Sequence, residues 1–256
     1  MEVINRSYLS YLLLVAVLGC FLLPANAQEF QSVTFEKIKT ENIKRVKGLS
    51  QNMVNTIIQD RHGFMWFGTW DGLNRYDGYD FRIFNKLNGM SNTTINTLLE
   101  DEDGMIWAGT QDGLNCLDPH SRSISVLKHD PNETNSLSNN TINHIFQDNE
   151  GYLWISTVQG LNKYDKDKKI FTHYNFHITN ADSIRTNWIN KVIQDKSGYL
   201  WIATRFGLFK FDVNTQLFIP HFHYLTESNS ISSDDINDIY EDSKGQIWVG
   251  TQNGLD

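Results

Sequence analysis

The sequence predicts an all-β fold: a β-propeller of four-stranded antiparallel blades, with about four and a half blades present as an incomplete ring. Tryptophan recurs with spacings of 41, 47, 47 and 47 residues, each time within the same short frame of residues. Aromatic residues make up 12% of the chain and prolines number only four, a composition that favours strands, because aromatic rings fit a pleated, buried surface. The 3.6-residue apolar spacing of a helical repeat is absent.

Each copy of the frame reads Asn, four residues, Asp, two residues, Gly, two residues, Trp, two residues, Thr, two residues, Gly-Leu. Seven matched positions in five copies exclude coincidence. The tryptophans that we assign a structural role in the frame are Trp66, Trp107, Trp154, Trp201 and Trp248. The copies occupy about 49–90, 91–137, 138–184, 185–231 and a truncated 232–256.

The third copy shows how the elements of one blade are predicted. Segment 142–148 is apolar on both sides, which indicates an inner strand sandwiched between neighbouring sheets. Asp148 to Gly151 is a turn, in which the Asp side chain accepts backbone N–H bonds and Gly takes a positive φ. The other three strands are expected at 153–155, which contains the largest buried side chain, and at 161–165 and 170–174, with a second turn at 157–160.

The first 27 residues read as a signal peptide. Arg6 supplies a basic start, Tyr8 to Leu23 is almost wholly apolar, and Ala25-Asn26-Ala27 fits the site that signal peptidase cuts. A retained membrane anchor and a lipid-modified Cys20 are the alternatives. Segment 28–48 is expected to supply the outer strand of a closing blade. These features predict export to the periplasm.

The net charge and the cysteine content exclude two further features, a nucleic-acid partner and an internal disulfide. A net charge of −8 argues against nucleic acid as a partner, because neutralising phosphates requires a basic surface. Beyond the signal peptide the sole cysteine is Cys116, so no internal disulfide is expected and stability must come from packing.

The repeats also predict where a ligand would bind. In a four-strand meander, the loop between strands two and three lies at the same end as the loop to the next blade. These loops differ between copies while the frame hardly changes, which is typical of a binding surface on a rigid scaffold. The ligand-binding candidates are Trp70, Asp71, Gln111, Asp112, Gln159, Trp188, Arg205 and Phe206.

Simpler roles compete with binding at several of these positions. Aromatic rings and an arginine suit sugars, but Trp188 lies two residues before the frame Asn and could pack between blades. Asp71 and Asp112 occupy equivalent turn positions, which favours turn chemistry over a pair of catalytic acids. The recurring Asp-x-x-Gly turns are structural rather than calcium loops. His221 and His223 have no evident third ligand, so we expect no metal, no cofactor and no catalytic residue.

Residues 151–165, Gly-Tyr-Leu-Trp-Ile-Ser-Thr-Val-Gln-Gly-Leu-Asn-Lys-Tyr-Asp, resemble the two-component regulator propeller repeat. The loops at 128–138 and 228–232 are similar to the inter-blade loops of that family, and the resemblance runs from about Leu49 to the last residue. It implies the periplasmic sensor region of a Bacteroidetes hybrid two-component histidine kinase. Such proteins have seven-bladed propellers, commonly sense oligosaccharides and would be anchored in the inner membrane.

The sequence departs from that family plan. It contains no second propeller, no later membrane helix and no histidine kinase, so we expect an N-terminal fragment of a sensor whose intact form could be a homodimer. The expected function is oligosaccharide sensing, and the chain itself is not expected to be an enzyme. The alternatives are a propeller enzyme acting on polysaccharide, a lyase or hydrolase, and a structural propeller that docks a protein.

Overall fold

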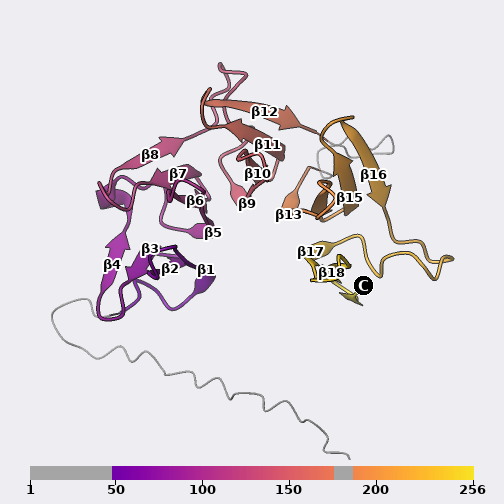
Figure 1. Ribbon diagram of the computed structural model, residues 1–256, viewed down its shortest axis with the longest axis horizontal. Coiled ribbons are helices and arrows are strands. Elements are labelled where there is room, and N and C mark those ends of the chain that lie inside the picture. The colour runs from indigo at the N-terminus through magenta and orange to yellow at the C-terminus, as the bar shows by residue number, and fades with distance from the viewer. Residues whose placement is uncertain (1–47, 176–186) are drawn as a thin grey trace, which may run out of the picture. The chain divides into compact units, whose positions relative to one another are not determined.

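The computed structural model describes residues 48–175 and 187–256. Its regular secondary structure is almost entirely strand, arranged as five antiparallel sheets that follow one another in chain order from indigo to yellow in Figure 1. The predicted all-β propeller repeats are therefore confirmed. The signal peptide and almost all of segment 28–48 lie outside the described residues. Among those residues, no helix is long and apolar enough to cross a membrane.

We call the five sheets blades 1 to 5, and strands are paired in the order in which they occur along the chain. Blade 1 contains β1 (Val54–Gln59), β2 (Met65–Thr69), β3 (Gly72–Tyr76) and β4 (Phe81–Phe84). A short 3-10 helix, η1 (Lys86–Asn88), leads to blade 2. Blade 2 contains β5 (Ile95–Glu100), β6 (Ile106–Thr110), β7 (Gly113–Leu117) and β8 (Ile124–Leu127).

Blade 3 shows the predicted meander. It contains β9 (Ile142–Gln147), β10 (Leu153–Thr157), β11 (Gly160–Asp165) and β12 (Ile170–Tyr174). Blade 4 contains β13 (Ile189–Gln194), β14 (Leu200–Thr204), β15 (Gly207–Asp212) and β16 (Leu217–His221). Blade 5 contains β17 (Ile236–Glu241), β18 (Ile247–Thr251) and the two-residue β19 (Gly254–Leu255).

The turn between the first two strands works as the sequence predicts. In blade 3, Asp148 Oδ1 accepts the backbone N–H groups of Glu150 and Tyr152 at 3.0 and 2.9 Å, and Gly151 has φ 86°. Asp148 Oδ2 also accepts the indole N–H of Trp154 at 2.7 Å, a contact repeated in all five blades. The frame Asp thus joins the turn to the buried Trp.

The frame tryptophans lie in the cores between blades. Trp66 and Trp154 are fully buried, and Trp107 is 4% exposed. Trp201 is half-buried and stacks on His221, with ring centroids 5.5 Å apart. Trp248 of blade 5 differs from the other frame tryptophans: it is 41% exposed, because within the described residues no further sheet covers that face.

Neighbouring blades are joined by a regular series of hydrogen bonds near the starts of the inner strands. The side-chain amide of each frame Asn donates to a backbone carbonyl at the start of the next inner strand. The four bonds, at 2.7–2.9 Å, join Asn55 to Ile95, Asn96 to Ile142, Asn143 to Ile189 and Asn190 to Ile236. The frame Asn therefore fixes each blade to its successor.

The opposite ends of the inner strands are joined in a second way. The backbone N–H after the frame Asp donates to the side chain of the residue just before the frame Asp of the next blade. The acceptors are Glu100, Gln147, Gln194 and Glu241. Each blade interface is thus bonded at both ends of its inner strand.

His144 is expected to make stability depend on pH. It lies on β9, where its Nδ1 accepts the N–H of Val192 at 3.4 Å, and burial, followed by the charge of Lys191, lowers its pKa to about 4 from 6.5. The unfolded chain therefore binds a proton that the folded chain does not, and stability falls as pH drops from 6.5 to 4.

The matched variant is His144→Thr, since Thr56 and Thr97 occupy this position in blades 1 and 2. We expect the variant to remove about 2 kcal/mol of the wild-type loss over this interval. Denaturant unfolding at pH 7 and pH 4.5 measures the difference. Identical pH dependence in the two proteins would contradict the assignment.

Candidate functional site

The loops between the second and third strands lie beside the loops that lead to the next blade. The Gly that ends each of these turns donates its N–H to a carbonyl in the following inter-blade loop. The four bonds, at 2.7–2.9 Å, join Gly72 to Thr93, Gly113 to Asn140, Gly160 to Asn187 and Gly207 to Asp234. The variable loops of successive blades therefore share one end of the sheets.

A hollow of about 530 Å³ lies at this end. We call it the inner-strand hollow, because its lining comes from the starts of the inner strands β5, β9, β13 and β17 and from the neighbouring turns. Its lining residues are Asn96, Gln111, Thr141, Asn143, Trp188, Asn190, Arg205, Asp235 and Asn237. They occupy three equivalent positions of the repeat: the frame Asn, the residue two before it and the residue after the frame Thr.

Trp188 and Arg205 form the most distinctive part of this lining. The Arg205 guanidinium carbon lies 4.5 Å from the centroid of the Trp188 ring, a cation–π contact. Arg205 is exposed and Trp188 is 36% exposed. The pair places a planar cation over an indole ring in the lining of the hollow.

The amides of the hollow also have free hydrogen-bonding capacity. Asn96, Asn143 and Asn190 each use one side-chain N–H for the bond to the next blade. Among the described residues, their side-chain oxygens accept no hydrogen bond, and the side chain of Gln111 forms none. The hollow therefore offers acceptors and donors together.

The structure brings three of the eight candidates, Gln111, Trp188 and Arg205, together in this hollow. Trp70 occupies the Arg205 position in blade 1, but its indole N–H donates to Asn55 Oδ1 at 3.2 Å and it does not line the hollow. Asp112 forms an ion pair with Lys128 at 2.8 Å.

The remaining candidates have turn roles. The backbone N–H groups of Asp71, Asp112, Gln159 and Phe206 donate to the hydroxyl of the preceding frame Thr, at 3.0–3.1 Å. None of the four lines the hollow.

The candidates proposed from sequence did not include the frame asparagines as lining residues. The signal was present, since the frame Asn opens the inner strand at the same end as the Thr-x-x-Gly turn. It was passed over because the candidates were chosen in loops that differ between copies, whereas the frame Asn is the same in all five. The structure shows a bond to the next blade for one amide hydrogen and an uncommitted oxygen beside the hollow.

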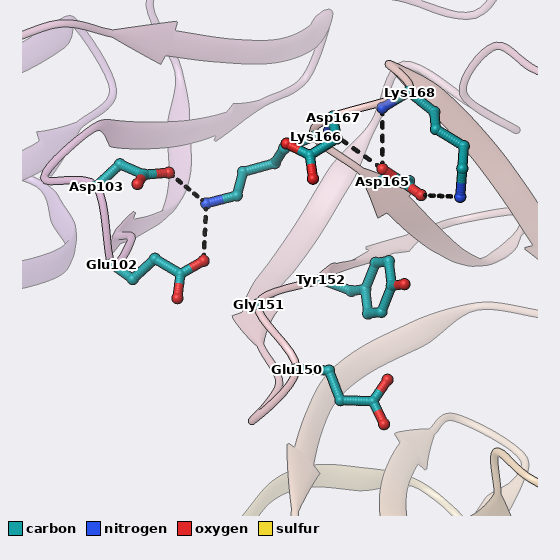
Figure 2. A pocket seen from close by; sticks show the side chains of 9 residues that line it. All are labelled: Glu102, Asp103, Glu150, Gly151, Tyr152, Asp165, Lys166, Asp167 and Lys168. Atoms are coloured by element: carbon teal, nitrogen blue, oxygen red, sulfur yellow. Dashed lines mark hydrogen bonds and ion pairs between the residues drawn. The ribbon is translucent and has the colours of Figure 1, made fainter.

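A second hollow, of about 300 Å³, lies at the opposite end of blades 2 and 3 (Figure 2). Figure 2 shows the Lys166 ammonium between Glu102 and Asp103, with Nζ–O distances of 3.2 and 2.7 Å. Burial opposes the charge, but the hydrogen bond to Asp103 and the charge of Asp101 outweigh it and raise the pKa of Lys166. Both lysines of this hollow are held in ion pairs, Lys166 with Glu102 and Asp103 and Lys168 with Asp165, so we assign it a structural role.

Metal and thiol chemistry have little support in the described residues. Within 48–175 and 187–256, no three His, Cys, Asp or Glu side chains are grouped to hold a metal ion. His223 Nδ1 lies 2.7 Å from the carbonyl oxygen of Ile231, while His221 stacks on Trp201. Cys116 is a buried free thiol, and burial raises its pKa to about 12, which keeps it in the unreactive thiol form.

Comparison with known proteins gives a consistent family assignment. A family model described as "Two component regulator propeller" matches residues 48–71, 89–112, 136–159, 183–206 and 230–253. A histidine kinase, "Histidine kinase P4" of Formosa agariphila, is 51% identical over 39 residues, which are 15% of this chain and 3% of that protein. The matched segment is thus a small part of a much longer relative.

Two solved structures support the fold. The extracellular domain of a protein assigned to the hybrid two-component systems of B. thetaiotaomicron is 23% identical, with a TM-score of 0.52, over 84% of this chain and 41% of that domain. Virginiamycin B lyase from Staphylococcus aureus is 12% identical, with a TM-score of 0.55, over 78% and 67%. At these identities the likeness concerns the propeller architecture, which sensors and enzymes share.

Proposed function

Because the chain belongs to the two-component regulator propeller family, we propose that it is the ligand-sensing part of a hybrid two-component sensor and that it binds an oligosaccharide in the inner-strand hollow. The similar B. thetaiotaomicron domain is extracellular, which supports a location in the periplasm. Phosphorylation output would come from a kinase outside this chain.

The observation that carries the ligand class is the chemistry of the hollow. Sugars present C–H faces that stack on indole rings, and hydroxyls that donate and accept at once. The hollow supplies Trp188 for the first and the amides of Gln111 and the frame asparagines for the second. Its volume, about 530 Å³, suits a ligand of a few sugar rings.

The propeller-enzyme alternative needs acid and base groups beside the substrate. The residues lining the hollow include one carboxylate, Asp235, and neither His nor Tyr. This composition favours binding over catalysis. Release of reducing ends or unsaturated products from any polysaccharide incubated with the chain would reverse that preference.

A thermal-shift screen of the full chain against oligosaccharides tests the proposal. A ligand at 100 times its Kd should add about 2.7 kcal/mol of stability. Trp188→Ala should abolish the shift, because it removes the stacking surface. Trp70→Ala is the matched control, since Trp70 is 50% exposed in a loop of blade 1 but does not line the hollow.

Three results would count against the proposal. These are equal loss of the shift in both variants, no shift with any oligosaccharide, or stabilisation by a protein partner alone. The last would favour the structural, protein-docking propeller.

A further inference from the structure

Arg205 has a cationic group that the fold leaves uncommitted. In the described part of the chain its side chain donates no hydrogen bond and forms no ion pair; it stacks on Trp188, with the guanidinium carbon 4.5 Å from the ring centroid. The guanidinium of Arg61, by contrast, donates hydrogen bonds to the Glu100 carboxylate and to two backbone carbonyls of the next blade. The five N–H donors of Arg205 remain available for a partner from outside.

The repeat itself does not require a cation at this position. The equivalent residues in the other blades are uncharged: Trp70, Gln111, Val158 and Gln252. The turn forms in each case, because it depends on the frame Thr and Gly. Arg205 therefore adds chemistry to the turn rather than holding it together.

The stack on Trp188 prepares Arg205 for binding. A guanidinium that lies over a ring keeps its edge N–H groups free, and a fixed fork of donors matches the two oxygens of a carboxylate or sulfate. Because the side chain is already held by the ring, it loses less conformational entropy when an anion binds.

Asp235, the other charged residue of the hollow, is compatible with binding of an anion by Arg205. Asp235 is the single carboxylate among the lining residues, and it forms no ion pair with Arg205 within the described residues. A carboxylate accepts hydrogen bonds from sugar hydroxyls. The hollow thus suits a ligand with an anionic group at Arg205 and neutral hydroxyls at Asp235.

We propose that the oligosaccharide recognised by this chain is acidic and that Arg205 binds its carboxylate or sulfate group. This inference rests on the proposed function and deepens it. Charge-assisted, two-pronged contacts are stronger than neutral ones, so the acidic ligand should bind about tenfold more tightly than its uncharged counterpart.

Calorimetric titration of the full chain with matched sugar pairs tests the inference. One pair is oligogalacturonate and the same oligosaccharide with its carboxyl groups reduced to alcohols. The other is a sulfated oligosaccharide and its desulfated form. The two pairs distinguish a carboxylate from a sulfate as the recognised group.

Three variants sharpen the result. Arg205→Gln should weaken binding of the acidic member about tenfold and change the neutral member less than twofold. Arg205→Lys should restore part of the preference, because it returns the charge without the fork. Lys210→Gln is the control: it removes a cation stacked on Tyr199, 3.9 Å from the ring centroid, outside the hollow.

The outcomes separate this inference from the proposed function. If neutral members bind as well as acidic ones, or Arg205→Gln weakens both equally, Arg205 only supports Trp188 and the inference fails while sugar sensing stands. If no member of either pair binds, the inference fails, and the thermal-shift screen against other oligosaccharides decides the proposed function separately. A preference for the acidic member that vanishes in Arg205→Gln and persists in Lys210→Gln supports the inference.

Discussion

Replacing Trp154 with alanine is expected to lower the free energy of unfolding by about 3–5 kcal/mol, because the change empties a fully buried site between two blades. The ring contacts Tyr174 and Phe211, with centroids 5.3 and 6.3 Å away, and its indole N–H bonds to Asp148. All of these interactions are lost together. Guanidinium unfolding followed by far-UV circular dichroism measures the change.

The fifth repeat provides the matched control. Trp248→Ala alters the same frame position, but that ring is 41% exposed, so the expected loss is about 1 kcal/mol. Trp154→Phe should fall between the two, since it keeps a ring but loses the indole bond. Equal losses at Trp154 and Trp248 would show that burial between blades does not determine the contribution of this residue.

Removing the frame carboxylate of blade 3 is expected to be nearly as costly. Asp148→Ala leaves two backbone donors of the turn and the buried indole N–H without their acceptor. Buried donors left without acceptors are expensive, so we expect a loss of about 3 kcal/mol. The variant should also loosen the turn at Gly151, because the carboxylate accepts two of the hydrogen bonds that hold the turn.

The control for this change is Asp242→Ala in blade 5. Asp242 accepts the equivalent bonds, but its contact with the indole of Trp248 is longer, at 3.2 Å, and exposed, so water can replace it. A loss of about 1 kcal/mol is expected. Hydrogen exchange at Tyr152 and Gln246 reports the two turns separately. Unchanged exchange at Tyr152 in Asp148→Ala would contradict the role assigned to the carboxylate.

The strands could be predicted from the sequence because each frame position obeys local rules. Asp and Gly define the turn, and Trp requires a buried position. The spacing between successive turns sets the length of each strand. Each of these requirements is met inside a single blade. The five copies of the frame therefore all support the same interpretation. The burial of Trp248 could not be judged in this way, since it depends on which sheet lies next to blade 5.

Side chains that tie a strand to the loop at the start of the same blade were harder to predict. Asn74 shows the difficulty: it is fully buried, and its amide bonds to Ser50, 24 residues earlier. Asn115 and Asn162 repeat the contact with Ser91 and Ser138, whereas blade 4 has Phe209 at this position. The Gly-Leu-Asn pattern was visible, but the partner Ser lies outside the frame.

For the inner-strand hollow, the sequence could predict the end of the sheets at which it lies but not the residues that line it. The repeat put its turns at one end of the sheets, which is a matter of topology. The meeting of Gln111, Trp188 and Arg205 depends on how three blades pack sideways, and no spacing within a single repeat encodes that. Arg205 was a candidate because it lies in a variable loop outside the frame and carries a guanidinium, and the structure shows what its neighbours are.

The bonds between blades have a consequence for how such a chain can evolve. Each pairs one residue at a fixed place in the repeat with a backbone group or an equally placed side chain of the next repeat. A duplicated or deleted unit of 47 residues would therefore recreate a working interface at its new junction. Recombination between copies can therefore change the number of repeats without requiring a new kind of contact between blades. The residues of the turns between the second and third strands take no part in these bonds, so they can vary independently.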